Sequence, residues 1–242
     1  MSVRMNARLS TAAGLEAAAE SALAFVRDGA RVGLGTGRAA SAFIARLGAR
    51  ARAGLAVTCV ATSEASARLA RAAGLRLVDL DEEHLLDVTV DGADEVAPNL
   101  NLIKGRGGAF VRERIVAAAS RRQVIVVGPE KLVGALGETG PVPVEVIPMA
   151  LGPCMRRLKE LGVRPTLRPD AAGAQPFVSD NGNLVVDVAL ACTLLDAAAA
   201  RAIDAELRAI PGIVDTGLFI ATAERVLVGQ PDGDVDTRWP QH

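Results

Sequence analysis

The sequence has few aromatic residues, and its positive and negative charges nearly cancel. Aromatic residues make up 2% of the 242 residues and tyrosine is absent, which leaves little surface on which nucleic-acid bases could stack. The formal net charge of -1, from 27 basic and 28 acidic residues, provides no overall attraction for a polyanion. The composition therefore disfavours nucleic acid as a partner, and an anionic ligand would have to be held by local groups.

Cysteines are also few, and long apolar runs are missing. Cys59, Cys154 and Cys192 are scattered and lie in apolar segments, so we expect reduced core residues, which fits a reducing cytoplasm. No apolar run approaches the roughly 20 residues of a membrane-spanning helix, and the first ten residues lack the apolar segment of a secretory signal. The sequence thus predicts a soluble, cytoplasmic protein with no membrane partner.

Short apolar runs alternate with alanine-rich helical stretches in the first half of the chain. This pattern predicts an α/β fold with a Rossmann-like parallel sheet and helices on both of its faces. We expect helices near 11–28, 38–50, 63–73 and 109–121, and strands near 30–34, 55–60, 75–79, 86–91 and 123–128. Gly29 should end the first helix in a left-handed conformation. Ligands of such sheets bind beyond the carboxyl ends of the strands.

The pattern changes from about residue 129 and predicts a smaller α+β (ferredoxin-like) subdomain. Its turn signal is Asp180-Asn181-Gly182, in a hairpin-like segment. The other expected elements are strands near 142–147, 213–220 and 225–229 and helices near 149–161 and 196–209. We expect a Rossmann-like catalytic domain at 1–133, the small subdomain at 134–209, and a C-terminal segment at 210–242 that returns to the first domain.

Two glycine loops lie between an expected strand and an expected helix. In the first, Gly35-Thr36-Gly37 could bring backbone N–H groups and a helix N-terminus to an anion, or could be a tight turn without a ligand. In the second, Lys104 enters a glycine-rich segment, and Arg106 and Lys131 could add positive charge or lie in solvent.

Two further groups of side chains each allow two interpretations. Ser63 precedes a helical run and is expected to cap it, with Thr62 or Ser63 as ligand contacts in the alternative. Glu113 could point toward the same crevice as the glycine loop, or it could pair with Arg112 or Arg114 on a solvated helix face.

Three carboxylates, Asp91, Asp94 and Glu95, follow one buried strand. Crowded carboxylates acquire separated pKa values, which suits proton transfer. A metal site is the competing reading, but the spacing is not that of a calcium loop, and Lys104 would compete with a cation. The histidines are His84 and His242 alone, which disfavours a zinc site or a histidine base.

The motifs together resemble those of the ribose-5-phosphate isomerase type A family, in order and over nearly the whole chain. They are GLGTG at 33–37, TSEAS at 62–66, DGADE at 91–95, KGRGGA at 104–109 with Arg-Glu at 112–113, PVEVIPMA at 143–150, SDNGN at 179–183 and IPGIVDTGLF at 210–219. The resemblance implies interconversion of ribose 5-phosphate and ribulose 5-phosphate without a metal or organic cofactor. It also implies self-association, as a homodimer or homotetramer.

The resemblance also implies roles for individual residues. Glu113 falls on the position of the base that moves a proton between C1 and C2 through an enediol, and Asp91 on a position assigned to ring opening. Asp94 and Lys104 fall on positions that hold and polarise sugar oxygens. Expected substrate-binding positions are Gly35, Thr36, Gly37, Arg38, Ala39, Gly92, Ala93, Gly105, Arg106, Gly107 and the phosphate-contacting Lys131.

The chain departs from the family pattern near the expected phosphate site. The first loop of the family usually reads GTGST, whereas this chain has Arg38 and Ala39, and a lysine common in the first helix is missing from residues 12–15. We hypothesise that the Arg38 guanidinium replaces these groups. Arg106 stands where glycine is common and either contacts phosphate or points to solvent.

Two other functions compete with the isomerase. A non-catalytic sugar-phosphate sensor on the same fold has support only from the changed GTGRAA loop, and the chain has no basic extension for a DNA-binding helix pair. A related amino-sugar-phosphate deaminase or CoA transferase would need histidine, which is scarce, or a glutamate nucleophile in another loop context.

Overall fold

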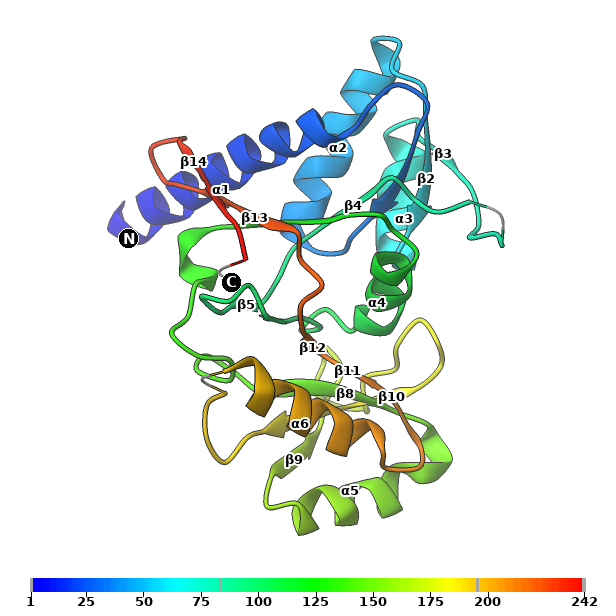
Figure 1. Cartoon of the computed structure of the whole chain (residues 1–242), viewed down its shortest axis with the longest axis vertical. Helices are drawn as coiled ribbons and strands as arrows, with labels where there is room; N and C mark the ends of the chain where they lie inside the picture. Colours follow the sequence, from blue (N-terminus) through cyan, green and yellow to red (C-terminus); the bar gives the residue numbers. More distant parts are fainter. Residues whose placement is uncertain (1, 83, 195, 241–242) are drawn as a thin grey trace. The chain divides into compact units, whose positions relative to one another are not determined.

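The computed structural model describes residues 2–82, 84–194 and 196–240, and for residues 2–11 it describes only the backbone. The chain forms two compact units (Figure 1). Unit 1 comprises Met1–Ala93, Arg112–Leu132 and Ala221–His242, and unit 2 comprises Asp94–Val111 and Val133–Ile220. The bounds differ from the domains expected from the sequence, since residues 94–111 and 210–220 group with unit 2.

Unit 1 contains a seven-stranded sheet with the strand order β14-β13-β7-β4-β1-β2-β3. Neighbouring strands are parallel, apart from the antiparallel pair of β13 and β14 at one edge. The strands are β1 (Ala30–Leu34), β2 (Val57–Ala61), β3 (Arg76–Leu77), β4 (Val88–Asp91), β7 (Gln123–Val127), β13 (Arg225–Gly229) and β14 (Val235–Arg238). All residues of β4 and β7 are buried, as expected for strands that are covered on both faces.

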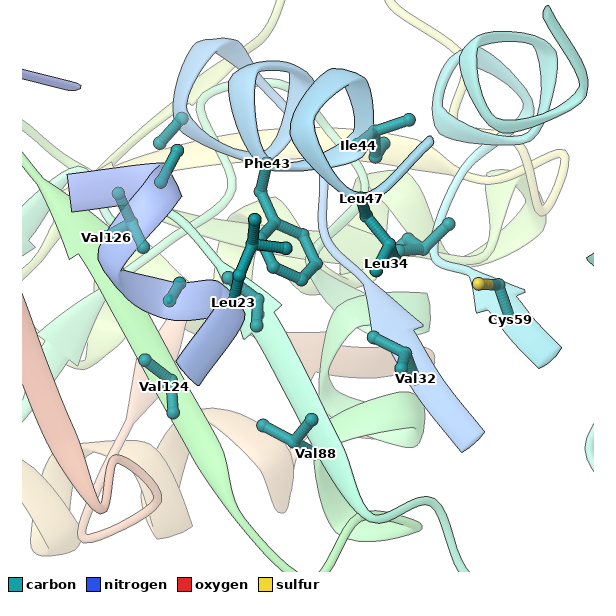
Figure 2. Packing of buried hydrophobic residues seen from close by; sticks show 14 of the residues in the cluster. Leu23, Val32, Leu34, Phe43, Ile44, Leu47, Cys59, Val88, Val124 and Val126 are labelled. Carbon is teal, nitrogen blue, oxygen red and sulfur yellow. The ribbon is translucent and has the colours of Figure 1, made fainter. Parts of the chain in front are cut away.

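Helices cover both faces of this sheet, as the sequence predicts. They are α1 (Ser2–Ala22), the 3-10 helix η1 (Leu23–Phe25), α2 (Arg38–Arg52), α3 (Glu64–Ala72) and α4 (Phe110–Ala118), of which the last begins in unit 2. Phe43 and Leu47 of α2 pack with Val32 and Leu34 of β1 in the main core (Figure 2). On the opposite face a Cβ on Gly33 would lie 2.6 Å from Val116 of α4. Close packing of α4 thus requires glycine there.

One turn and the buried thiol of unit 1 can be compared with the expectations. Gly29 adopts the expected left-handed conformation with a φ of 76°, but it does not end the first helix, because η1 ends at Phe25 and Val26 is its C-cap. Cys59 is a fully buried, free thiol of the core, and burial raises its pKa to about 12. Among the residues that the structure describes, no helix is both long and apolar enough to cross a membrane.

Unit 2 contains a four-stranded antiparallel sheet, β11-β8-β10-β9, and a three-stranded antiparallel sheet, β12-β6-β5. The strands are β5 (Glu95–Val96), β6 (Leu102–Ile103), β8 (Val142–Val146), β9 (Arg164–Leu167), β10 (Leu184–Ala189), β11 (Ile213–Thr216) and β12 (Leu218–Phe219). The helices are α5 (Leu151–Glu160) and α6 (Ala197–Arg208), and short 3-10 turns are η2 (Pro129–Lys131, in unit 1) and η3 (Pro148–Ala150). Val144 and Val186 pack against Leu158 of α5 and Leu207 of α6.

Two expectations for unit 2 were wrong. The turn at Gly182 exists, with a φ of 78°, but the segment before it contributes one bridge, from Val178 to Leu184. Strand β10 instead pairs along its length with β8 and β9, because these strands offer full partners for its backbone. Cys192 is exposed rather than part of the core, since it lies in a bend after β10.

Candidate active site

The first glycine loop connects β1 to α2 in unit 1 and lies against the end of β4. The Gly35 N–H donates to the carbonyl of Val90 at 2.9 Å. A Cβ on Gly35 would lie 2.1 Å from Oδ1 of Asp91, so any larger residue would displace this carboxylate. Asp91 itself is 1% exposed. The glycine is therefore needed for close approach of the loop to Asp91.

Asp91 is oriented by the backbone around it. Its Oδ1 accepts from the N–H of Thr36 at 3.1 Å and from the N–H of Gly92 at 2.7 Å. These two bonds fix one carboxylate oxygen against the glycine loop, so two motifs that lie 55 residues apart in the sequence form one cluster in unit 1. Ala93, the last residue of unit 1 before the chain enters unit 2, is half-buried.

The hydroxyl of Thr36 lies in a small cluster of hydroxyl groups. Its Oγ1 donates to Oγ of Ser63 at 2.8 Å and lies 2.8 Å from Oγ1 of Thr62. Ser63 accepts from the N–H of Ser66, so its expected role as the N-cap of α3 is confirmed. Since Thr62 and Ser63 are 0% and 4% exposed, we assign them to the support of the loop.

The first turn of α2 presents backbone N–H groups at the end of this loop. Gly37 precedes it with a φ of 101°, a conformation that favours glycine, and it has no side chain with which to cap the helix. Arg38 is the exposed first residue of α2, and Ala39 is buried. The helix dipole and these N–H groups favour an anion here.

Glu113 lies in the first turn of α4, and its side chain is buried, with 5% exposure. Its neighbour Arg112 donates to Glu64 at 3.2 Å on the surface. The alternative that placed Glu113 on a solvated helix face was wrong, because this face of α4 packs inward. Lys131, at the end of η2, is half-buried.

Lys104 follows β6 in unit 2 and is 2% exposed. Its N–H donates to the carbonyl of Gly217 at 2.9 Å, and its Nζ lies 5.4 Å from the centre of the Phe219 ring. The ring face attracts the ammonium group through a cation–π contact. The lysine is thus held by β12, a strand that comes more than a hundred residues later.

The two carboxylates Asp94 and Glu95 of unit 2 bind different loops. Oδ2 of Asp94 accepts from the N–H of Arg106 at 2.8 Å, so Asp94 is bound to the second glycine loop. Glu95 is fully buried and accepts from Gly137 N–H and from the N–H and hydroxyl of Thr139, at 2.6–2.7 Å. Glu95 therefore anchors the loop at 137–139.

Arg106 makes a contact that neither sequence-based alternative included. Its Nη2 donates to the hydroxyl of Thr139 at 2.9 Å and lies 3.8 Å from Oε1 of Glu95. A Cβ on Gly140 would come within 2.6 Å of the same nitrogen, so the guanidinium lies close against this loop. Gly105 is buried next to it, and Gly107 is exposed.

Sequence reasoning missed a second arginine at this loop. Nη1 of Arg168 donates to the carbonyls of Gly105 and Arg106, at 2.8 and 3.2 Å. Arg168 lies just after β9, in a stretch without a recognisable motif, so no local signal indicated it.

The predicted site residues are divided between the two units. Unit 1 contains Asp91, Glu113, Lys131 and the loop at 35–39, and unit 2 contains Asp94, Lys104 and the loop at 105–107. Within the described residues, no group of three or more histidine, cysteine or acidic side chains is arranged to hold a metal ion. His84 is exposed and contacts Asp81, whereas His242 lies outside the described residues.

Comparison with known proteins identifies relatives over almost the full chain. Residues 58–233 match the family model of ribose 5-phosphate isomerase A (phosphoriboisomerase A). A ribose-5-phosphate isomerase A from Roseiflexus sp. (strain RS-1) is 47% identical, over 92% of this chain and 94% of its own length.

Solved structures agree in fold as well. The ribose 5-phosphate isomerase A of Methanocaldococcus jannaschii has a TM-score of 0.86 and 39% identity, covering 94% of this chain and 98% of its own. A D-ribose-5-phosphate isomerase in complex with phospho-erythronic acid has a TM-score of 0.88 and 36% identity, covering 93% and 97%. With this identity and coverage, the chain belongs to the ribose 5-phosphate isomerase A family.

Proposed function

We propose that the chain interconverts D-ribose 5-phosphate and D-ribulose 5-phosphate, the step of the non-oxidative pentose phosphate pathway that its relatives are named for. The observation that carries the proposal is the buried carboxylate of Glu113, one helical turn beyond the loop that begins with buried Lys104. A buried base and a buried ammonium group are what proton transfer through an enediolate requires.

Glu113 is the proposed general base. An aldose and its ketose are isomers: one proton is removed from C2 and delivered to C1, or the reverse, and a hydroxyl proton moves between the oxygens of the same two carbons. A carboxylate that stays next to both carbons can accept the proton and return it, without an added cofactor. Burial removes water that would compete for that proton, which supports this role for a side chain with 5% exposure.

Lys104 and the two aspartates are proposed to act on the sugar oxygens. The ammonium group of Lys104 stabilises the negative charge that develops on the enediolate oxygen. Asp91 opens the sugar ring and moves hydroxyl protons, and Asp94 holds a hydroxyl group. Backbone N–H groups bind Oδ1 of Asp91, which orients the carboxylate for the proposed proton transfer.

The phosphate is proposed to bind at the first glycine loop. The N–H groups at the start of α2 supply donors, and Arg38 and Lys131 supply positive charge. Gly92, Ala93 and the backbone at 105–107 complete the proposed substrate contacts. A relative of 36% identity has been solved in complex with phospho-erythronic acid, a phosphorylated sugar acid, which supports a sugar phosphate as the ligand of this chain.

The proposal is tested by incubating the metal-free protein with ribose 5-phosphate and following ketose formation, for the wild type and for Glu113→Gln. Loss of the base should lower kcat by about 10²- to 10⁴-fold with KM largely retained. Glu64→Gln, an exposed glutamate of the same unit, is the matched control and should keep wild-type kcat. A requirement for added metal, or a kcat that Glu113→Gln leaves unchanged, contradicts this mechanism.

We also propose self-association as a dimer or tetramer through unit 2. Ile147, Met149 and Val214 are 46%, 92% and 39% exposed, and they lie at one end of the paired strands β8 and β11. Sedimentation of the purified protein measures the oligomer directly, and a monomer at micromolar concentration rejects the proposal.

A further inference from the structure

Arg168 binds the second glycine loop through its main chain. Its Nη1 donates to the carbonyl of Gly105 at 2.8 Å and to that of Arg106 at 3.2 Å. The side chain is largely buried, with 12% exposure. Hydrogen bonds from a charged donor are roughly twice as strong as those from a neutral one, so the two carbonyls are held firmly.

Asp187 of β10 orients the guanidinium. The Nε of Arg168 donates to Oδ2 of Asp187 at 2.9 Å, and Nη2 pairs closely with Oδ1. This two-point pairing uses one edge of the planar fork and leaves Nη1 directed at the loop. A lysine at this position has a single ammonium group and could not make both sets of contacts with the same geometry.

Phe177 supports the other side of this arrangement. Its ring lies 5.8 Å from Cζ of Arg168, and a Cβ on Gly108 would come within 2.3 Å of the ring. The loop also closes on itself, because the N–H of Gly108 donates to the carbonyl of Gly105 at 3.0 Å. The Gly105 carbonyl therefore accepts from Gly108 and from Arg168 together.

These contacts control the backbone that follows Lys104. On one side, the N–H of Lys104 is bound by Gly217, and a Cβ on Gly217 would lie 2.2 Å from the Lys104 carbonyl oxygen. On the other side comes Gly105, whose φ of 109° belongs to a flexible, glycine-only conformation. Without Arg168 the chain could rotate at this glycine, and the backbone that carries the lysine would be held less firmly on this side.

We infer that Arg168 is a positioning residue for the isomerisation, acting through the Gly105–Arg106 backbone on the ammonium group of Lys104. This inference rests on the proposed function, in which Lys104 stabilises the enediolate. A displacement of about 1 Å in a catalytic group can cost 10²-fold in rate. The effect on kcat should exceed the effect on KM, because Lys104 acts on the transition state and, although the backbone at 105–107 is also a proposed substrate contact, the proposed phosphate contacts belong to the other glycine loop.

The kinetic test uses Arg168→Lys, which keeps the charge but removes the fork. We expect kcat to fall about 10- to 100-fold while KM changes less than threefold, as for an interaction made in the transition state. The matched control is Arg208→Lys on α6 of the same unit, which loses longer contacts to Asp204 and Asp215 and should keep wild-type kcat. An unchanged kcat in Arg168→Lys overturns the inference.

A double-mutant cycle separates positioning from general support of the fold. If Arg168 acts through Lys104, then Arg168→Lys should change the residual kcat of the Lys104→Ala enzyme less than twofold. If the two losses multiply instead, Arg168 acts independently of the lysine, and the inference is rejected.

A third measurement does not depend on activity. Amide hydrogen exchange of the segment 104–108 should be at least tenfold faster in Arg168→Lys than in the wild type, and unchanged in Arg208→Lys. If the wild type does not isomerise ribose 5-phosphate, the proposed function fails. Hydrogen exchange still tests whether Arg168 holds the loop, and an unchanged exchange rate at 104–108 in Arg168→Lys shows that it does not.

Discussion

Both glycine loops connect a strand to a helix, but they are held in place by different means. The loop at 35–37 is supported by backbone groups and by uncharged hydroxyls, together with one aspartate at the end of the neighbouring strand. The loop at 105–108 is supported by charged side chains, with Asp94 on one N–H and Arg168 on two carbonyls. The first loop packs against its own sheet, whereas the second depends on residues from several parts of unit 2.

This difference follows from where each loop begins. The first loop leaves β1, which is flanked by β2 over its full length and by β4 at its carboxyl end, so the backbone has buried partners within reach. The second loop leaves β6, a strand of two residues, which offers few ladder hydrogen bonds. A loop that leaves so short a strand needs side chains to define its path, and charged hydrogen bonds are the strongest available.

The largest effect is expected for Gly35→Ala in the first loop. The new Cβ would lie 2.1 Å from Oδ1 of Asp91, so the carboxylate and its backbone must move. We expect a loss of about 2–3 kcal/mol in the free energy of unfolding, as for an overpacked core, and a fall in kcat of about 10²-fold or more.

Gly54→Ala is the control for that substitution. Gly54 has a φ of 109° with no atom within 4 Å of the new Cβ, so it tests backbone strain without a clash. The variant should lose about 1–2 kcal/mol of stability with kcat unchanged. Denaturant unfolding and steady-state assays measure both quantities, and equal kcat values for the Gly35→Ala variant and the wild type would show that Asp91 does not depend on this close approach.

The comparison also shows what the sequence could reveal. The strands β1, β4 and β7, the Ser63 cap and the first glycine loop all have local signals: apolar runs, a serine before a helix, and glycines after a strand. Each of these signals acts over a few residues. They could therefore be interpreted without knowing which distant segments meet.

The parts that the sequence did not reveal depend on distant partners. Strands β5 and β6 have two residues each, too short for a periodic pattern, and β6 is completed by β12 from far along the chain. Arg168 and Asp187 look like ordinary surface charges until the sheet pairs β9 with β10. In the sequence Glu95 belongs to the same acidic run as Asp91 and Asp94, and only the fold turns it toward Thr139.

An intermediate effect, on KM, is expected for Arg38→Ala. This substitution tests whether the charged side chain at the end of the first loop binds the phosphate. Arg38 is exposed at the start of α2, where the family usually has a hydroxyl residue. If its guanidinium binds the phosphate, KM should rise about tenfold or more, equivalent to about 1.4 kcal/mol, with kcat changed little. Arg50→Ala, in the last turn of the same helix, is the control, and an unchanged KM for Arg38→Ala removes the hypothesis.

The smallest effect is expected for Arg106→Gly in the second loop, which restores the residue common in the family. The side chain is 41% exposed, and its guanidinium is bound to Thr139 and lies near Glu95. Solvent screens such a contact, so we expect a loss of at most about 1 kcal/mol in stability and a KM within twofold of the wild type. Thr139→Val removes the same hydrogen bond from its other end, together with the bond from Thr139 to Glu95, so the stability losses of the two substitutions should be less than additive when combined. A KM that rises fivefold or more in Arg106→Gly, but not in Thr139→Val, would instead indicate that Arg106 contacts the phosphate. Both loops would then contribute to phosphate binding.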